Sequence, residues 1–167
     1  MLFRSGLADN KNLQRHAEAL AGLDVHLRII GEPSAAQVAM LESHGLEFST
    51  ASKLSEEELQ EEYAVADVLL FCSTLEGYGM PIIEAQTVGV PVVTSDRSPM
   101  RETAGGGAAL ADPDEADSIR KALLQILQDE TLRTELVTKG HDNAATCSAA
   151  RSARLHAELY RSLMPEA

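Results

Sequence analysis

The sequence has few cysteines and few positive charges, and each shortage excludes a class of protein. Its 167 residues include two cysteines, Cys72 and Cys147, which have neither the number for a disulfide framework nor the spacing of a metal site. The formal net charge of -12 argues against nucleic acid or an anionic membrane as a partner, because an acidic field repels polyanions. We therefore expect free thiols in a reducing compartment, the cytoplasm.

Long apolar runs and several common motifs are also missing. No run approaches the roughly 20 apolar residues that cross a bilayer, and the N-terminus lacks a signal-type apolar segment. Neither a Gly-x-Gly-x-x-Gly after the first expected strand nor a Gly-x-x-x-x-Gly-Lys-Ser/Thr is present, which argues against nicotinamide and P-loop chemistry. Histidines are scattered without metal spacing, so we expect surface or helix-face residues and no metal: His16, His26, His44, His141 and His156.

What is present is a regular alternation of strand and helix patterns. Strands are expected at 2–5, 25–30, 46–49, 68–72, 91–95 and 107–111. Helices are expected at 34–44, 99–103, 130–139 and 149–163, and from Asn10, Ser55, Pro81 and Asp112 onward. The alternation predicts an α/β fold in one domain, residues 1–167, with a Rossmann-like doubly wound parallel sheet of about six strands.

Cap residues mark the expected helix ends. Asn10 and the stretch from Asp112 to Glu115 suit N-caps, and Ser55 with Glu58 fits a capping box. Gly140 is expected to end the helix that begins near Glu130.

The most informative motif lies in residues 73–85. Two carboxylates, Glu76 and Glu84, bracket the loop Gly77-Tyr78-Gly79 between a buried strand and a helix whose first position suits Pro81. A helix start presents unpaired N–H groups and a partial positive charge, so phosphate would bind there, and glycines allow a ligand close to the main chain. Either carboxylate could accept two sugar hydroxyls.

On these residues alone, an interpretation in which neither carboxylate binds a ligand is equally open. Glu84, placed in the first turn of the helix, would only complement its dipole, and Glu76 would be a solvated loop charge.

A similar choice applies to Lys11, at the start of the first helix. Loops 6–11, 73–80 and 94–100 should meet beyond the carboxyl ends of the strands. Lys11 is then either a phosphate counter-ion or an exposed surface lysine.

A Glu, seven residues and a second Glu, with Gly-aromatic-Gly-x-Pro between them, resembles the donor-site signature of retaining glycosyltransferases of family 4 (glycosyl transferases group 1), which have the GT-B fold. The similarity continues through 89–96, 101–105 and 108–113. The resemblance implies a C-terminal, donor-binding domain of a mannosyltransferase-like enzyme, with the N-terminal acceptor-binding domain absent from this chain.

The resemblance also implies roles for individual residues. Lys11 would grip the donor diphosphate, Glu84 would bind the nucleotide ribose and Glu76 would contact the transferred hexose. Main-chain N–H groups near Gly79 and Met80, beside Gly77 and Tyr78, would face the sugar or diphosphate. Arg4 is a further candidate for the phosphates, although Arg4-Ser5-Gly6 replaces the Gly-Arg pair of many relatives.

On this basis we expect transfer of a hexosyl group, with retention, from a nucleoside-diphosphate sugar to an acceptor hydroxyl in polysaccharide or glycoconjugate assembly, without a metal. GDP-mannose is the first candidate donor. A saccharide or lipid-linked acceptor would bind through the missing domain, so this chain alone should bind donor weakly and transfer slowly or not at all. Leu155, Leu159 and Leu163 of the last helix would point toward that domain, and an uncovered stripe would favour self-association.

Two alternatives to an enzyme domain follow from the same alternation. One is a noncatalytic nucleotide-binding module or regulatory subunit that retains the fold. The other is a receiver-type signalling domain, which would require a phosphoacceptor aspartate at the end of a central strand, where this chain has Cys72-Ser73-Thr74.

Overall fold

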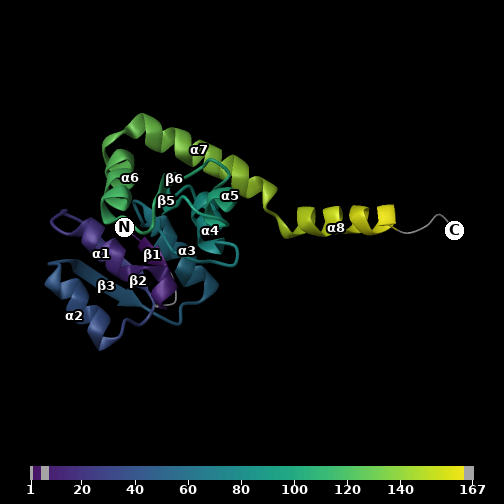
Figure 1. Cartoon of the computed structure of the whole chain (residues 1–167). Coiled ribbons are helices and arrows are strands. Elements are labelled where there is room, and N and C mark those ends of the chain that lie inside the picture. Colours follow the sequence, from purple (N-terminus) through teal and green to yellow (C-terminus); the bar gives the residue numbers. More distant parts are fainter. Residues whose placement is uncertain (1, 5–7, 164–167) are drawn as a thin grey trace.

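Strands and helices alternate along the chain in the computed structural model, which describes residues 2–4 and 8–163 (Figure 1). The strands are β1 (Leu2–Arg4), β2 (His26–Ile30), β3 (Glu47–Ala51), β4 (Leu69–Phe71), β5 (Val92–Ser95) and β6 (Ala109–Ala111). The helices are α1 (Leu13–Leu20), α2 (Ala35–Ser43), α3 (Glu56–Ala64), α4 (Met80–Thr87), α5 (Met100–Ala104), α6 (Ala116–Gln128), α7 (Glu130–Thr146) and α8 (Ala149–Leu163). A short 3₁₀ turn, Asp9–Lys11, precedes α1.

All strands pair in parallel, in the order β3-β2-β1-β4-β5-β6. Strands β2 and β3 lie on one side of β1. The chain then returns to the centre of the sheet, where β4 pairs with β1, and β5 and β6 follow on the other side. This is the order of a doubly wound Rossmann-like sheet, so the predicted fold class is confirmed. The receiver-type alternative is wrong, because that fold has the strand order 2-1-3-4-5.

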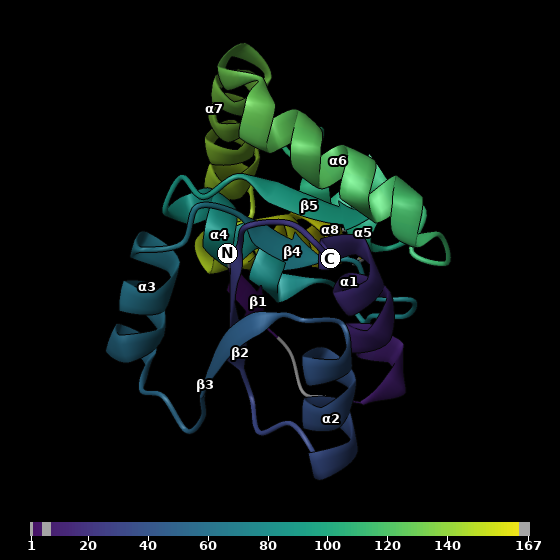
Figure 2. The same ribbon diagram turned by 90° about the vertical axis from the view of Figure 1, so that its left-hand side faces the viewer.

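The burial of successive residues around β4 explains why helices cover both faces of the sheet. Val68, Leu70 and Cys72 point into one apolar cluster, whereas Leu69 and Phe71 point into another, as the two-residue period of a strand requires. Because neither side faces water, each side needs a helical layer. Figure 2 shows α1 and α2 on one side of the sheet and α3 on the other.

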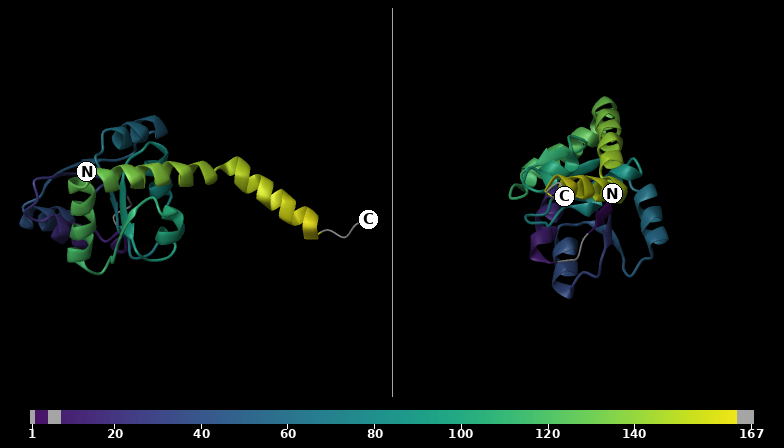
Figure 3. Two further views of the ribbon diagram at one scale, coloured as in Figure 1. Left: turned by 90° about the horizontal axis from the view of Figure 1, so that it is seen from above. Right: turned by 90° about the vertical axis from the view of Figure 1, so that its right-hand side faces the viewer.

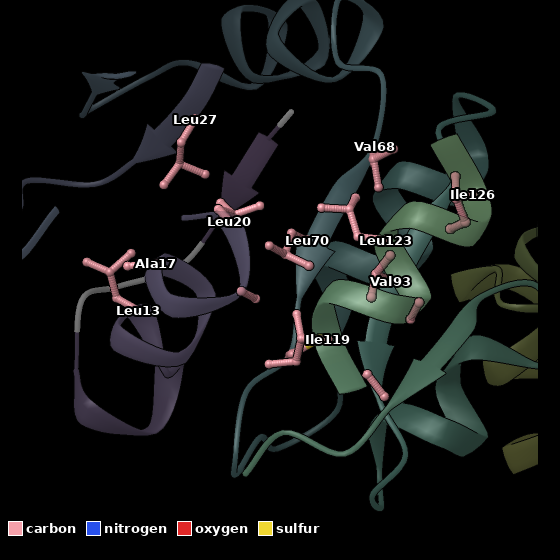
Figure 4. Packing of buried hydrophobic residues seen from close by; sticks show 14 of the residues in the cluster. Leu13, Ala17, Leu20, Leu27, Val68, Leu70, Val93, Ile119, Leu123 and Ile126 are labelled. Carbon is pink, nitrogen blue, oxygen red and sulfur yellow. The ribbon is translucent and has the colours of Figure 1, made fainter. Parts of the chain in front are cut away.

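We call these groups the first and second core clusters. The first is formed by α1, α2 and α6 over the sheet, and Figure 4 shows part of it: Leu13, Ala17, Leu20, Leu27, Val68, Leu70, Val93, Ile119, Leu123 and Ile126. The second is formed under α3, α4 and α5 by Tyr63, Leu69, Phe71, Ile82, Ala85, Val90, Val92, Met100, Ala104 and Ala108.

The predicted caps hold in some helices and not in others. Ser55 and Glu58 form the expected capping box, with Glu58 N–H donating to Ser55 Oγ at 3.1 Å and Ser55 N–H to Glu58 Oε2 at 2.7 Å. Asn10 is not the cap of α1, which begins after Asn12. Asp112 does not cap α6 either, because its carboxylate accepts the N–H of Asp114 in the preceding turn.

The predicted end of a helix at Gly140 is wrong, because α7 continues to Thr146. Gly140 is buried where α7 crosses the turn that contains Gly107. A Cβ on Gly107 would lie 2.4 Å from Gly140 Cα. The glycine therefore serves close approach of two backbones rather than termination.

The last helix, α8, extends away from the rest of the domain (Figures 1 and 3). Its leucines are exposed as the sequence suggested, with Leu155 at 48%, Leu159 at 54% and Leu163 at 71%. In the part of the chain that the structure describes, none of the helices has the length and apolar character needed to cross a membrane.

Candidate functional site

The candidate site lies where the strand order reverses, between β1 and β4. These two strands are neighbours, but the chain leaves them toward opposite edges of the sheet. The segments that follow them, residues 8–12 and 72–76, meet beyond the carboxyl ends of the strands, and we call this junction the crevice. In open parallel sheets this is the usual place for a ligand.

Two asparagines hold the two loops together on either side of Lys11. Asn10 accepts the N–H of Thr74 at 2.8 Å on its carbonyl oxygen, and its side-chain amide donates to the carbonyl of Leu75 at 2.8 Å. Asn12 has φ of 61°, a left-handed conformation that asparagine tolerates, and its amide donates to Cys72 O at 2.9 Å and to Pro113 O at 2.7 Å. The loop after β1 is thus fixed to the loop after β4.

Lys11 and Glu76 form an ion pair across this crevice. Lys11 Nζ lies 2.7 Å from Glu76 Oε1, and the two side chains are only 19% and 12% exposed. The ammonium also lies 5.7 Å from the centre of the Phe71 ring, within the range of a cation–π contact. Lys11 is therefore not a freely exposed surface lysine, and Glu76 is not a solvated loop charge. An ammonium has three donors, so the contact with Glu76 leaves it able to hold an anion as well.

Helix α4 begins at this crevice because Gly79 turns the chain. Gly79 has φ of 99°, and a Cβ there would lie 3.2 Å from Ile82 Cδ1, so a glycine suits the position on both counts. Pro81 follows at the second helical position. Gly77 differs: its φ is not in the left-handed region and a Cβ would meet nothing within 4 Å. Neither its backbone angle nor the space around it therefore requires a glycine at Gly77.

Tyr78 and Met80 lie at the exposed end of the same loop. Tyr78 is 49% exposed and Met80 is 53% exposed. The carbonyl of Tyr78 accepts the hydroxyl of Thr103 at 2.6 Å, which fixes the loop main chain to α5. A hydrogen bond to Cys147, together with the negative charge of its thiolate form, raises the pKa of the Tyr78 phenol.

Glu84 has different neighbours from Glu76. It lies in the second turn of α4, not in the first as expected, so it is not placed to complement the helix dipole. Its Oε2 accepts the hydroxyl of Tyr63 from α3 at 2.9 Å. Both residues line a pocket of about 420 Å³ between α3 and α4, with Leu59, Gln60 and Thr87 among the others.

His16 is a buried residue beneath the crevice that sequence reasoning missed. It was expected on a surface or helix face, but its ring lies wholly inside, where Nε2 accepts the N–H of Cys72 at 3.1 Å. Burial lowers the pKa of His16 to about 3, so the ring is neutral near pH 7. The spacing of Leu13, Ala17 and Leu20 marks the buried face of α1, and His16 lies on it, which is the signal that could have found it.

Two further expectations concern Arg4 and the absence of a metal site. The side chain of Arg4 lies outside the described residues, as does Gly6. Across residues 2–4 and 8–163, no three His, Cys, Asp or Glu side chains gather in a way that could hold a metal ion.

The parallel sheet and its switch point between β1 and β4 define a Rossmann-like class of α/β domain. Residues 1–142 match the family described as "Glycosyl transferases group 1", and the chain belongs to this family.

Named relatives include several mannosyltransferases. The chain is 39% identical over 85 residues to O-antigen chain mannosyltransferase B of Escherichia coli, a match that covers 51% of this chain and 22% of that protein. It is 28% identical over 142 residues to phosphatidyl-myo-inositol mannosyltransferase of Mycolicibacterium smegmatis, covering 82% of this chain and 30% of that protein. The chain thus spans less than a third of the length of either relative.

Solved structures share the fold at low sequence identity. Sucrose-phosphate synthase of Thermosynechococcus elongatus matches with a TM-score of 0.86 and 22% identity, over 97% of this chain and 44% of that chain. The C-terminal domain of the glycosyl transferase group 1 protein LpcC from Francisella tularensis matches with a TM-score of 0.74 and 20% identity, over 87% and 84%. Anabaena HepE, solved in complex with UDP and glucose, matches with a TM-score of 0.79 and 19% identity, over 98% and 48%. The fold is that of GT-B glycosyltransferases.

Proposed function

We propose that this chain is the donor-binding, C-terminal half of a retaining glycosyltransferase of family 4. The reaction is transfer of a hexosyl group, first of all mannosyl, from a nucleoside-diphosphate sugar to an acceptor hydroxyl of a polysaccharide or glycoconjugate. The observation that carries the proposal is the Lys11–Glu76 ion pair in the crevice between β1 and β4, beside the loop that opens α4. A mannosyltransferase function is supported by the names of the relatives, and GDP-mannose is the donor that we propose.

Each residue has a proposed role that the family resemblance implies and that its chemistry allows. Lys11 and the N–H groups near Gly79 and Met80 hold the diphosphate, and they stabilise the negative charge that grows on it as the glycosidic bond breaks. Glu76 exchanges part of its contact with Lys11 for a hydroxyl of the hexose. Glu84 accepts the ribose hydroxyls. Gly77 and Tyr78 form the rim of the site, and Arg4 is proposed as a second contact to the phosphates. No step needs a metal.

The proposed partners are the donor, an acceptor that is a saccharide or lipid-linked sugar, and a second copy of this chain. The acceptor contacts an N-terminal domain that the enzyme requires, and this chain alone binds donor weakly with little or no transfer. Leu155, Leu159 and Leu163 form the apolar stripe through which α8 self-associates. The cytoplasm is the proposed compartment, in keeping with Cys72 and Cys147 both being free thiols.

Nucleotide binding tests the proposal directly. A ligand that binds only the folded state raises the melting temperature, by about 5 to 10 °C at a hundred times Kd. We expect GDP to give the largest shift among GDP, UDP and ADP.

Calorimetric titration should show GDP affinity about tenfold lower or worse in Glu84→Ala and in Lys11→Ala, because each removes charge-assisted hydrogen bonds. Glu57→Ala and Lys121→Ala, at exposed helix positions, are matched controls.

The outcomes separate the candidate functions. If none of the three nucleotides raises the melting temperature or gives heat on titration, the proposal is wrong. If GDP binds with the expected dependence on Glu84, but no hexosyl transfer occurs from GDP-mannose even in a longer chain that includes an N-terminal half, the noncatalytic nucleotide-binding module is favoured.

A further inference from the structure

We propose that Tyr63 is the positioning residue for Glu84: its hydroxyl holds the carboxylate in the orientation that receives the two ribose hydroxyls of the nucleotide. The inference rests on the proposed function, which assigns the ribose to Glu84. It adds a residue from α3, 21 positions before Glu84 in the chain and outside the motif of residues 73–85.

The direction of the contact is fixed by the chemistry of its two groups. The Tyr63 hydroxyl lies 2.9 Å from Glu84 Oε2. A carboxylate can only accept, so the phenol O–H donates. Hydrogen bonds to a charged acceptor are stronger than those between neutral groups. Tyr63 therefore restrains one oxygen of Glu84, and with it the plane of the carboxylate.

The restraint is firm because the tyrosine ring is buried and packed against other apolar side chains. Tyr63 is 2% exposed and belongs to the second core cluster, where Leu69, Phe71 and Ile82 are also buried. Leu59 and Ala66 pack against the same cluster. In a close-packed interior, a ring held on several sides has one rotamer. Its hydroxyl is thus a fixed point at the edge of the pocket that Glu84 lines.

The same cluster also lies beneath Lys11. Phe71 belongs to it and lies under the ammonium of Lys11, with 5.7 Å between Nζ and the ring centre. One rigid apolar cluster therefore carries both the group proposed for the diphosphate and, through Tyr63, the group proposed for the ribose. Recognition of two adjacent hydroxyls by one carboxylate depends on its orientation, so loss of the Tyr63 hydroxyl should weaken ribose recognition selectively.

The test compares a nucleotide that has the ribose diol with one that lacks it. Wild type and Tyr63→Phe are titrated calorimetrically with GDP and with 2′,3′-dideoxyguanosine diphosphate. We expect Tyr63→Phe to weaken GDP binding about tenfold, the effect of losing one hydrogen bond to a charged group, and to leave the affinity for the dideoxy nucleotide unchanged. Tyr160→Phe, in the exposed part of α8, is the matched control. Ile119→Val, a mild cavity variant in the first core cluster, controls for lost stability.

Failure of the inference and failure of the proposed function give different results. If wild type binds neither nucleotide, or if Glu84→Gln binds GDP as wild type does, the function assigned to Glu84 is wrong. If Glu84→Gln loses the preference for GDP while Tyr63→Phe keeps it, the function stands and the positioning role of Tyr63 is refuted. Equal weakening of both nucleotides in Tyr63→Phe also refutes it, because that is the effect of a purely structural role.

A second variant covers the case in which Tyr63→Phe does not fold. Replacement of Tyr63 by 3,5-difluorotyrosine keeps the ring and the hydroxyl but makes the phenol more acidic. Once ionised, it places a negative charge beside Glu84 and no longer donates, so GDP affinity should fall with rising pH at values where wild type shows no change. Absorbance of the fluorinated phenol shows the pH at which it ionises, and an unchanged GDP affinity across that ionisation would refute the inference.

Discussion

The burial of His16 affects how the stability of the protein depends on pH. Its pKa is about 3 in the folded protein because burial disfavours the charged ring, and about 6.5 when unfolded. Between these values the unfolded chain binds the extra proton, so the stability that this group contributes is complete above pH 6.5 and is lost as the pH falls toward 3. Between pH 7 and pH 5 the loss should be about 2 kcal/mol.

Urea unfolding of wild type and His16→Gln at pH 7 and pH 5 measures this effect. Glutamine keeps a side-chain acceptor for the N–H of Cys72 but does not titrate. Carboxylates with lowered pKa values, such as Glu18 and Glu62, contribute equally to both proteins and cancel in the comparison. If His16→Gln loses as much stability as wild type over this range, His16 is not the group responsible.

At this scale the sequence identifies the charged residues of the site but not their partners. Lys11 and Glu76 could be predicted from a strand, a glycine loop and a helix start, because those local patterns place them at the same edge of the sheet. The bond from Tyr63 to Glu84 and the burial of His16 could not, because both depend on how helices pack across the sheet. Asn10 illustrates the limit: its residue type suits an N-cap, yet its amide donates to Leu75 of a distant loop.

At the scale of elements, α7 continues past Gly140 because the helix crosses the turn at Gly107 at that residue. Gly140 in a sequence is a stop signal, but here it allows contact between two backbones, and the lost helix propensity is offset by packing. Gln86 of α4 also lies at this crossing. Its Nε2 donates to Ala104 O at 2.9 Å, and its Oε1 accepts from Asn143 Nδ2 at 2.8 Å. A local pattern cannot show this, because the partner that overrides it lies in another element.

The close approach of α7 to the turn at Gly107 predicts which of three glycine-to-alanine substitutions destabilises the protein most. Gly107→Ala should destabilise most, by about 3 kcal/mol, because its Cβ would meet backbone atoms that cannot move aside. Gly140→Ala should cost less, since its Cβ would meet the side chain of Gln86 at 2.9 Å and a helix gains from alanine. Gly77→Ala, with open space around it, is the control. Urea midpoints measure all three, and a Gly107→Ala protein as stable as Gly77→Ala would contradict the crossing.

At the scale of the whole molecule, one topological feature produces the site. Because the strand order reverses between β1 and β4, residues 65 positions apart, such as Lys11 and Glu76, come within hydrogen-bond distance. Alternating strand and helix patterns predicted this sheet, since parallel strands need helical crossovers. The position of α8 could not be predicted in this way, because its stripe of leucines is exposed and not packed against the sheet.

The exposed stripe of α8 leads to a prediction about association. Leu155, Leu159 and Leu163 are spaced at four-residue intervals on one face and are each about half or more exposed. Burying them between two copies removes apolar surface from water. Sedimentation equilibrium should therefore show a dimer that grows with concentration, and Leu159→Ser should weaken it about tenfold, the effect expected for lost burial of one leucine. Arg161→Ser, two residues on and so on the far side of the helix, should leave association unchanged. A wild-type chain that stays monomeric at every accessible concentration would show that α8 does not join two copies.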